Sequence, residues 1–163
     1  MRYTLSLLAK RVLMIAVASW VSVAFAQTNL GAVLDVGGRQ LSADEFKRDV
    51  VGKVMRGVGT IAGGATTSTT RSGTLELVYL SAGAIRGAAQ GAGLGGAAAA
   101  GASFAIDGSW TIDERERVCT SIRMGAVVLA PRCQFWFVQG KQYFLSDSDS
   151  DRSARISSYT VQP

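Results

Sequence analysis

Three aspartates at alternate positions, Asp147, Asp149 and Asp151 in the stretch SDSDSDR, are the side chains that most resemble a metal site. A calcium loop of the EF-hand type begins with the same spacing of acids. Such a loop also needs Gly at its sixth position and Glu at its twelfth, where this chain has Arg152 and Ser158. The pattern therefore favours a solvated polar turn, in which the acids bond to nearby backbone amides and pair with neighbouring arginines. We predict no metal there.

The two cysteines, Cys119 and Cys133, could form a disulfide or half of a metal site. Two thiolates in a chain without histidine cannot complete an ordinary structural zinc site. Residues 1–26 have the layout of a secretory leader, which predicts export to an oxidising compartment, where disulfides form and persist. We therefore predict a disulfide between two flanking antiparallel strands, whose facing residues lie close enough for such a bridge.

Most common catalytic machinery is excluded by residue type. The absence of histidine rules out Ser-His-Asp and Cys-His mechanisms. The lysines outside the leader, Lys47, Lys53 and Lys141, belong to no Ser-x-x-Lys motif, and no phosphate-binding loop of the Gly-x-x-x-x-Gly-Lys type occurs. We predict a protein that is not an enzyme, with no catalytic residue and no cofactor.

Aromatic residues are dense between positions 110 and 144. They could pack the interior of a small sheet, or some of them could form a platform on which a ligand stacks. The first interpretation is the simpler one. If a binding surface exists, Trp110, Trp136 and Tyr143 are its candidate residues.

Residues 1–26 have the layout of a secretory signal peptide. Lys10 and Arg11 precede an apolar run at 12–23, and Ala-Phe-Ala at 24–26 supplies a small-x-small cleavage pattern. An uncleaved anchor is the alternative, but the apolar run is short for a span, which needs about 20 residues. Cleavage leaves 14 basic and 12 acidic side chains, so no nucleic-acid surface is indicated. We predict a periplasmic or secreted protein.

Residues 41–163 are expected to form a single β-rich domain, after an extended segment at 27–40. A helix is predicted at about 43–51, because Ser42 can cap it and Glu45 can complete a capping box. Leu41 before the cap and Phe46 inside the helix can form a hydrophobic staple. The fold predicted is α+β, with this short helix packed on an antiparallel sheet that could curl into an open barrel.

Strands are predicted where apolar and polar residues alternate or β-prone residues cluster. A turn is expected at Asp107-Gly108 and a hairpin around Gly140-Lys141. The predicted strands cover residues 74–80, 117–124, 126–130, 133–139, 142–146 and 154–161, with a short strand or turn at 85–88.

A Gly/Ala-rich insertion at 83–103 repeats small residues at every fourth position. This spacing lets helices approach closely, although glycine weakens a helix. Three alternatives stay open: a loop between strands, a packed helix, and a segment that contacts a membrane.

One stretch of the chain, residues 108–144, resembles a family of small exported bacterial proteins called domain of unknown function 995. The resemblance rests on a Gly-x-Trp strand, one Cys, a second Cys followed by aromatics, and a Gly turn before a Tyr. Upstream, Leu41, Glu45, Phe46, Gly52 and Lys53 also fit the family. The resemblance implies a periplasmic or secreted β-rich domain, and it offers no activity or catalytic residue.

Two functions follow as expectations. The first is an exported binding or accessory protein that holds a small molecule or an envelope protein. The second is an envelope-associated structural protein that self-assembles through residues 83–103. Neither the ligand nor the oligomeric state can be named from the sequence.

Overall fold

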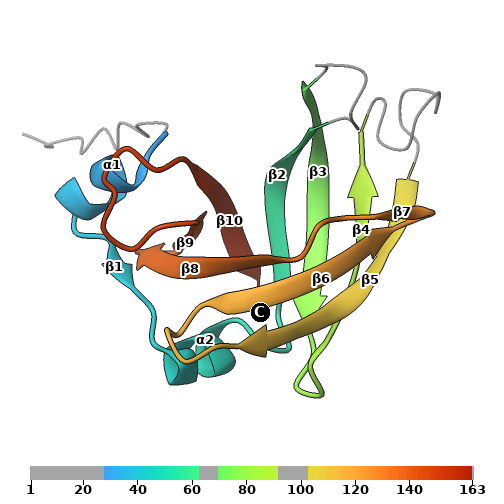
Figure 1. Cartoon of the computed structure of the whole chain (residues 1–163), viewed down its shortest axis with the longest axis horizontal. Coiled ribbons are helices and arrows are strands. Elements are labelled where there is room, and N and C mark those ends of the chain that lie inside the picture. The colour runs from blue at the N-terminus through green and yellow to red at the C-terminus, as the bar shows by residue number, and fades with distance from the viewer. Residues whose placement is uncertain (1–27, 63–69, 92–102, 163) are drawn as a thin grey trace, which may run out of the picture.

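A computed structural model describes residues 28–62, 70–91 and 103–162, and its main feature is a closed antiparallel β-barrel (Figure 1). In Figure 1, β5, β6 and β8 run across the front of β2, β3 and β4. The described barrel strands are β2 (Val54–Ala62), β3 (Thr70–Tyr79), β4 (Ala84–Gln90), β5 (Ser103–Ile112), β6 (Val118–Met124), β8 (Arg132–Gln139), β9 (Gln142–Ser146) and β10 (Ile156–Gln162).

Two pairings close the barrel. β10 returns to β2, with Tyr159 opposite Gly57. β6 pairs with β8 through three residue pairs, with Cys119 opposite Cys133 at the centre. Two short strands lie outside the circuit: β1 (Arg39–Gln40) on β8 and β7 (Val127–Val128) on β6. The fold is thus mostly β, and the sheet predicted to curl is fully closed.

The predicted helix forms as α2 (Ala43–Asp49). Ser42 and Glu45 make both bonds of the capping box, and Leu41 and Phe46 are buried in the same apolar cluster. α2 covers one end of the barrel, which we call the floor. The ring of Phe46 lies there, edge-on to three other aromatic rings at centroid distances of 4.8–5.4 Å.

The segment predicted to be extended at 27–40 contains a second helix, α1 (Leu30–Asp35), so that prediction is wrong. Asn29 caps α1 by accepting a hydrogen bond from the Ala32 amide. α1 packs on the outer face of β8 and β9, where alternate strand residues point away from the barrel interior. The helix and the two strands form an outer apolar cluster, which consists of Leu30, Val33, Phe135, Phe137 and Phe144.

One prediction based on glycine is wrong, because Asp107-Gly108 lies inside β5 and makes no turn. The short strand that was one of two predictions for 85–88 is confirmed within β4, so the helix alternative does not hold for residues 84–90. Gly87 and Gly108 permit close backbone approaches: a Cβ there would come within 2.0 Å of the Glu76 carbonyl oxygen and 2.2 Å of the Ser121 carbonyl oxygen, respectively. These glycines allow strands to approach closely as the sheet coils into a barrel.

Most other strand predictions are confirmed. β3 includes residues 74–79, β6 covers most of 117–124, and β8 and β9 form the hairpin at Gly140-Lys141. β10 covers most of the predicted last strand, whereas the strand at 126–130 shrinks to the two residues of β7. β2 was not predicted, because its sequence VMRGVGTIA interrupts the apolar alternation with glycine.

The predicted signal peptide at 1–26 and most of the Gly/Ala-rich insertion, at 92–102, lie outside the described residues. Among the described helices, none has the length and apolar character needed to cross a membrane.

Candidate binding cavity

The barrel encloses a cavity of about 150 Å³. Its walls come from the inward-facing residues of β3, β5, β6, β8, β9 and β10, together with Leu129 from the connection between β6 and β8. The lining residues are Leu75, Leu77, Tyr79, Ile106, Val118, Thr120, Ile122, Met124, Leu129, Arg132, Gln134, Trp136, Leu145, Ser157 and Tyr159. This alternation of inward and outward residues is what a small barrel imposes on each strand.

The wall is apolar except for a few hydrogen-bonding side chains. Arg132 is the only charged residue among those lining the cavity, and no carboxylate lines it. Thr120 and Ser157 add hydroxyl groups, and Gln134 adds an amide. A concave apolar site with a few polar groups is the usual composition of a small-molecule site.

Three buried donors in the cavity wall have no protein acceptor among the described residues: the hydroxyls of Tyr79 and Tyr159 and the indole N–H of Trp136. Their side chains belong to residues only 2%, 8% and 2% exposed. Burial raises the pKa of both tyrosine hydroxyls, so both are protonated donors at neutral pH. Buried polar groups in native proteins are nearly always hydrogen-bonded to protein or to ordered water. Acceptors from water or from a ligand in the cavity would therefore satisfy these three donors.

One edge of the cavity reaches solvent at Arg132, whose side chain is 62% exposed. The guanidinium contacts Asp147 through Nη2 at 3.1 Å, and the amide of Gln134 donates to the same carboxylate at 2.9 Å. Arg132 and Gln134 therefore share an anchor at the edge of the barrel. No described acceptor is bonded to Nε or Nη1 of Arg132.

The structure separates the three aromatic residues that were candidates for a binding surface. Trp136 lines the cavity, whereas Trp110 and Tyr143 do not. Trp110 is buried at the floor, where its N–H donates to the Leu80 carbonyl at 2.9 Å. Tyr143 lies partly buried against the inner core from β9.

Sequence reasoning missed Tyr79, Tyr159 and Arg132 as site residues. Arg132 and Gln134 alternate with Cys133 in β8, a pattern that normally indicates a solvent-facing side of a strand. Only closure of the barrel turns that side inward, so no local signal could have identified these residues.

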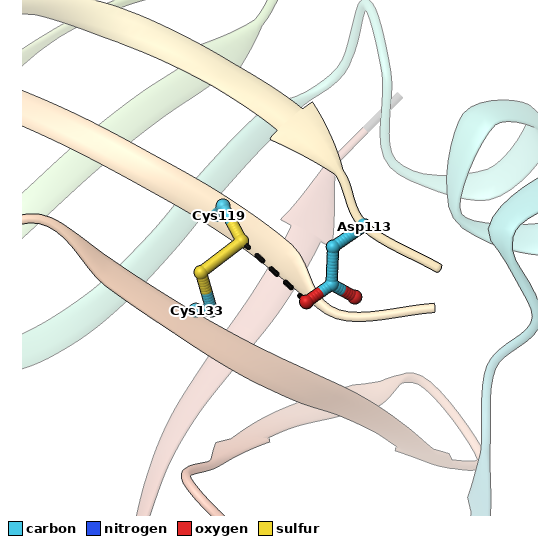
Figure 2. Close-up of side chains that lie close together, drawn as sticks. All are labelled: Asp113, Cys119 and Cys133. Atoms are coloured by element: carbon cyan, nitrogen blue, oxygen red, sulfur yellow. Dashed lines mark hydrogen bonds between the residues drawn. A yellow bond between two sulfur atoms is a disulfide. The ribbon is translucent and has the colours of Figure 1, made fainter. Parts of the chain in front are cut away.

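The predicted disulfide between Cys119 and Cys133 forms across the pairing of β6 and β8, with a sulfur–sulfur distance of 2.04 Å (Figure 2). An oxygen of Asp113 lies 3.9 Å from the Cys119 sulfur. Among the described residues these three side chains form the only group of potential metal ligands that converge. Because both sulfurs are in the disulfide, they are not available as thiolate ligands.

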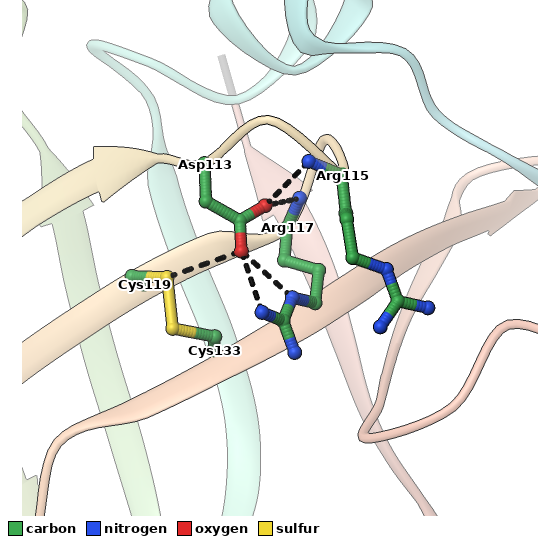
Figure 3. The surroundings of a disulfide bond; sticks show 5 residues. All are labelled: Asp113, Arg115, Arg117, Cys119 and Cys133. Carbon is green, nitrogen blue, oxygen red and sulfur yellow. Dashed lines mark hydrogen bonds and ion pairs between the residues drawn. A yellow bond between two sulfur atoms is a disulfide. The ribbon is translucent and has the colours of Figure 1, made fainter.

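Asp113 is held by the turn between β5 and β6, as Figure 3 shows. It accepts hydrogen bonds from the backbone amides of Arg115 and Arg117. It also forms an ion pair with the Arg117 guanidinium, at a distance of 2.7 Å. The bond from the Arg117 side chain is the main cause of a lowered pKa for Asp113. Both guanidinium groups also lie near the face of the Phe135 ring, at 5.5 and 6.0 Å from its centroid. Asp113, Arg115 and Arg117 do not line the barrel cavity.

The stretch SDSDSDR is a polar turn between β9 and β10, but its acids do not pair with neighbouring arginines as predicted. Asp147 contacts Arg132, and Asp149 lies 3.7 Å from Arg115. Arg152 instead pairs with Asp35 of α1. Asp151 accepts from the amide and the hydroxyl of Ser153, and these bonds lower its pKa. The turn thus connects α1, β8 and the β5–β6 turn.

No protein-family model, curated protein or solved structure matches the chain. The resemblance to domain of unknown function 995 therefore stays a prediction, and no residue role is carried over from a relative.

Proposed function

We propose that this chain is an exported, non-catalytic binding protein that holds a small, largely apolar molecule inside its barrel. The observation that carries the proposal is the cavity whose wall contains three buried donors without described acceptors. Eight-stranded barrels have interiors just wide enough to be filled by side chains or to hold one small ligand. Here the interior is not filled, and three buried donors of its wall have no acceptor among the described residues.

The size of the cavity limits the ligand. A cavity of about 150 Å³ in an apolar protein core is large enough to take one benzene molecule. The ligand is accordingly a small molecule, well below the size of a nucleotide, a haem or a long-chain lipid. A ligand of this size binds chiefly by burying apolar surface, which contributes about 25 cal/mol per Å².

Export belongs to the same proposal. It rests on the signal-peptide pattern at residues 1–26 and on the disulfide, since disulfides persist in oxidising compartments. The proposed location is the periplasm or the medium.

Calorimetric titration of the protein with benzene and with hexan-1-ol tests the proposal. We expect saturable binding of at least one of them, and loss of binding in Ile106→Phe, which fills the cavity from β5. The matched control is Val128→Phe in β7, where the side chain is exposed. No binding of these compounds or of the corresponding acids, benzoate and hexanoate, would contradict the proposal. Equal binding by Ile106→Phe, once its fold is checked by circular dichroism, would also contradict it.

The alternative is self-assembly in the envelope through residues 83–103. Residues 84–90 are now placed in β4, so the self-assembling segment would have to lie within 92–102. Deleting 92–101 leaves β4 and β5 intact. If that deletion converted an oligomer into a folded monomer in light scattering, the alternative would be preferred, whereas an unchanged mass would remove it.

A further inference from the structure

The chemical character of the cavity wall narrows the ligand class. Every polar side chain in the wall can donate a hydrogen bond, and none is an obligate acceptor, because no Asp or Glu lines the cavity. The only formal charge is the positive one of Arg132. A wall of this kind is complementary to a ligand that carries hydrogen-bond acceptors and a negative charge.

The donors occur at two places along the cavity. Tyr79 and Trp136 lie toward the floor, where their rings contact each other edge-on at a centroid distance of 5.7 Å. Tyr159 lies in β10, and the positive charge of Arg132 favours its ionised form, although burial has the larger effect and raises the pKa of its hydroxyl. Both residues line the same cavity.

Among the described residues, Asp147 is the acid in contact with Arg132, and it engages a single corner of the guanidinium, at Nη2. The same carboxylate accepts from Gln134. Asp147 therefore fixes the orientation of the arginine while Nε and Nη1 keep donors for another acceptor. A guanidinium binds carboxylates well because its donors form a planar fork.

We propose that the ligand is a small monocarboxylate of roughly six to ten non-hydrogen atoms, a size set by the cavity, with its carboxylate at Arg132 and Tyr159 and its apolar part against Leu77, Ile106 and Met124. This inference rests on the proposed function and specifies the ligand of the same cavity. Aromatic acids of the size of benzoate and aliphatic acids of the size of hexanoate both meet the description.

Calorimetric titration with matched pairs tests the inference: hexanoate against hexan-1-ol, and benzoate against benzyl alcohol. The wild-type protein is expected to bind each acid at least tenfold more tightly than its alcohol. Arg132→Gln should lower the affinity for the acids at least tenfold and change the affinity for the alcohols less than twofold. Arg132→Lys, which keeps the charge, should restore part of the affinity. Tyr159→Phe should weaken the acids about threefold or more.

Arg86→Gln is the matched control, because Arg86 is an exposed arginine of β4 that does not line the cavity. It should leave both affinities unchanged. If the alcohols bind as tightly as the acids, the inference is overturned while the proposed function stands. If neither class binds, the proposed function itself fails. The comparison within the wild-type protein decides the matter even if Arg132→Gln does not fold.

Discussion

The floor and the cavity wall belong to one apolar cluster, but they differ in whether their buried donors have hydrogen-bond acceptors. At the floor, the N–H of Trp110 donates to the Leu80 carbonyl, and Phe46 is packed against three aromatic rings. Along the cavity, the N–H of Trp136 and the hydroxyl of Tyr159 have no acceptor in the described residues. Two tryptophans of the same core therefore differ in whether their donor is satisfied. The rings of Tyr79 and Trp136 help to pack the floor, but their polar atoms belong to the cavity. The satisfied donor of Trp110 therefore stabilises the fold, whereas the unpaired donors of the cavity wall reduce its stability.

Removing the central ring of the floor should have the largest effect. Phe46→Ala deletes a side chain that is 1% exposed and leaves a void among the aromatic rings. We expect the free energy of unfolding to fall by about 3–5 kcal/mol, measured by urea denaturation. The control is Val58→Ala in β2, a residue 63% exposed, which should change it by less than about 0.5 kcal/mol. Similar values for the two variants would contradict the account of the floor.

The closure of the cavity side should depend on the disulfide. Replacing both cysteines with serine removes the covalent bond at the central one of the three residue pairs that join β6 to β8. The bridge spans 14 residues, and loops of that length are worth about 3 kcal/mol of stability. We expect a loss of about that size in thermal or urea unfolding.

The control for this prediction is chemical. Wild-type protein treated with a reducing agent should match the serine variant, and the variant should not respond to the reducing agent. Full stability after reduction would show that the strand pairing alone closes the barrel.

Removal of an unpaired donor should change the free energy of unfolding by a smaller amount and in the opposite direction. Tyr79→Phe removes a buried hydroxyl without a described partner, so the unliganded protein should be unchanged or more stable by up to about 1 kcal/mol. Trp110→Phe, which breaks a formed hydrogen bond, should lose stability. A loss of more than about 1 kcal/mol in Tyr79→Phe would mean that the hydroxyl has a partner within the protein, and the contrast between floor and cavity would disappear.

The smallest effect should come from the rim of the floor, at the capping box of α2. A hydrogen bond from Arg39 is the main cause that lowers the pKa of Glu45 from 4.5 to about 2. A carboxylate with a lowered folded-state pKa stabilises the fold above pH 4.5, and this contribution is lost as the pH falls toward 2. Glu45→Gln should therefore flatten the pH dependence of unfolding between pH 2 and 4.5. Arg39→Gln should flatten it in part, and an unchanged profile in both variants would contradict the assignment.

The parts of the fold that the sequence predicts are those fixed by local signals. The capping box at Ser42 and Glu45 lies within one helical turn, and the hairpin at Gly140-Lys141 joins adjacent strands. α1 was missed because it is one and a half turns long and is held by tertiary contacts, including the bond from the Leu30 amide to the Ala154 carbonyl.

Glycine misled the prediction because its local meaning is ambiguous. A glycine after an aspartate usually marks a turn, yet here Gly108 lets β5 and β6 approach each other closely. The cavity could not be predicted either, since Tyr79, Arg132 and Tyr159 come together only after β10 reaches β2. No periodicity within a single segment reports that closure.

The pairing of β10 with β2 joins Gln162 to Val54, residues more than a hundred positions apart. Non-local pairings of this kind form late, because the loop that they close is long. The wall therefore stays incomplete until residues 156–162 have been made, and β2 and β9 keep unpaired edges until then. For a protein proposed to be exported, this order of assembly has a consequence: the barrel cannot close before β10 has been synthesised.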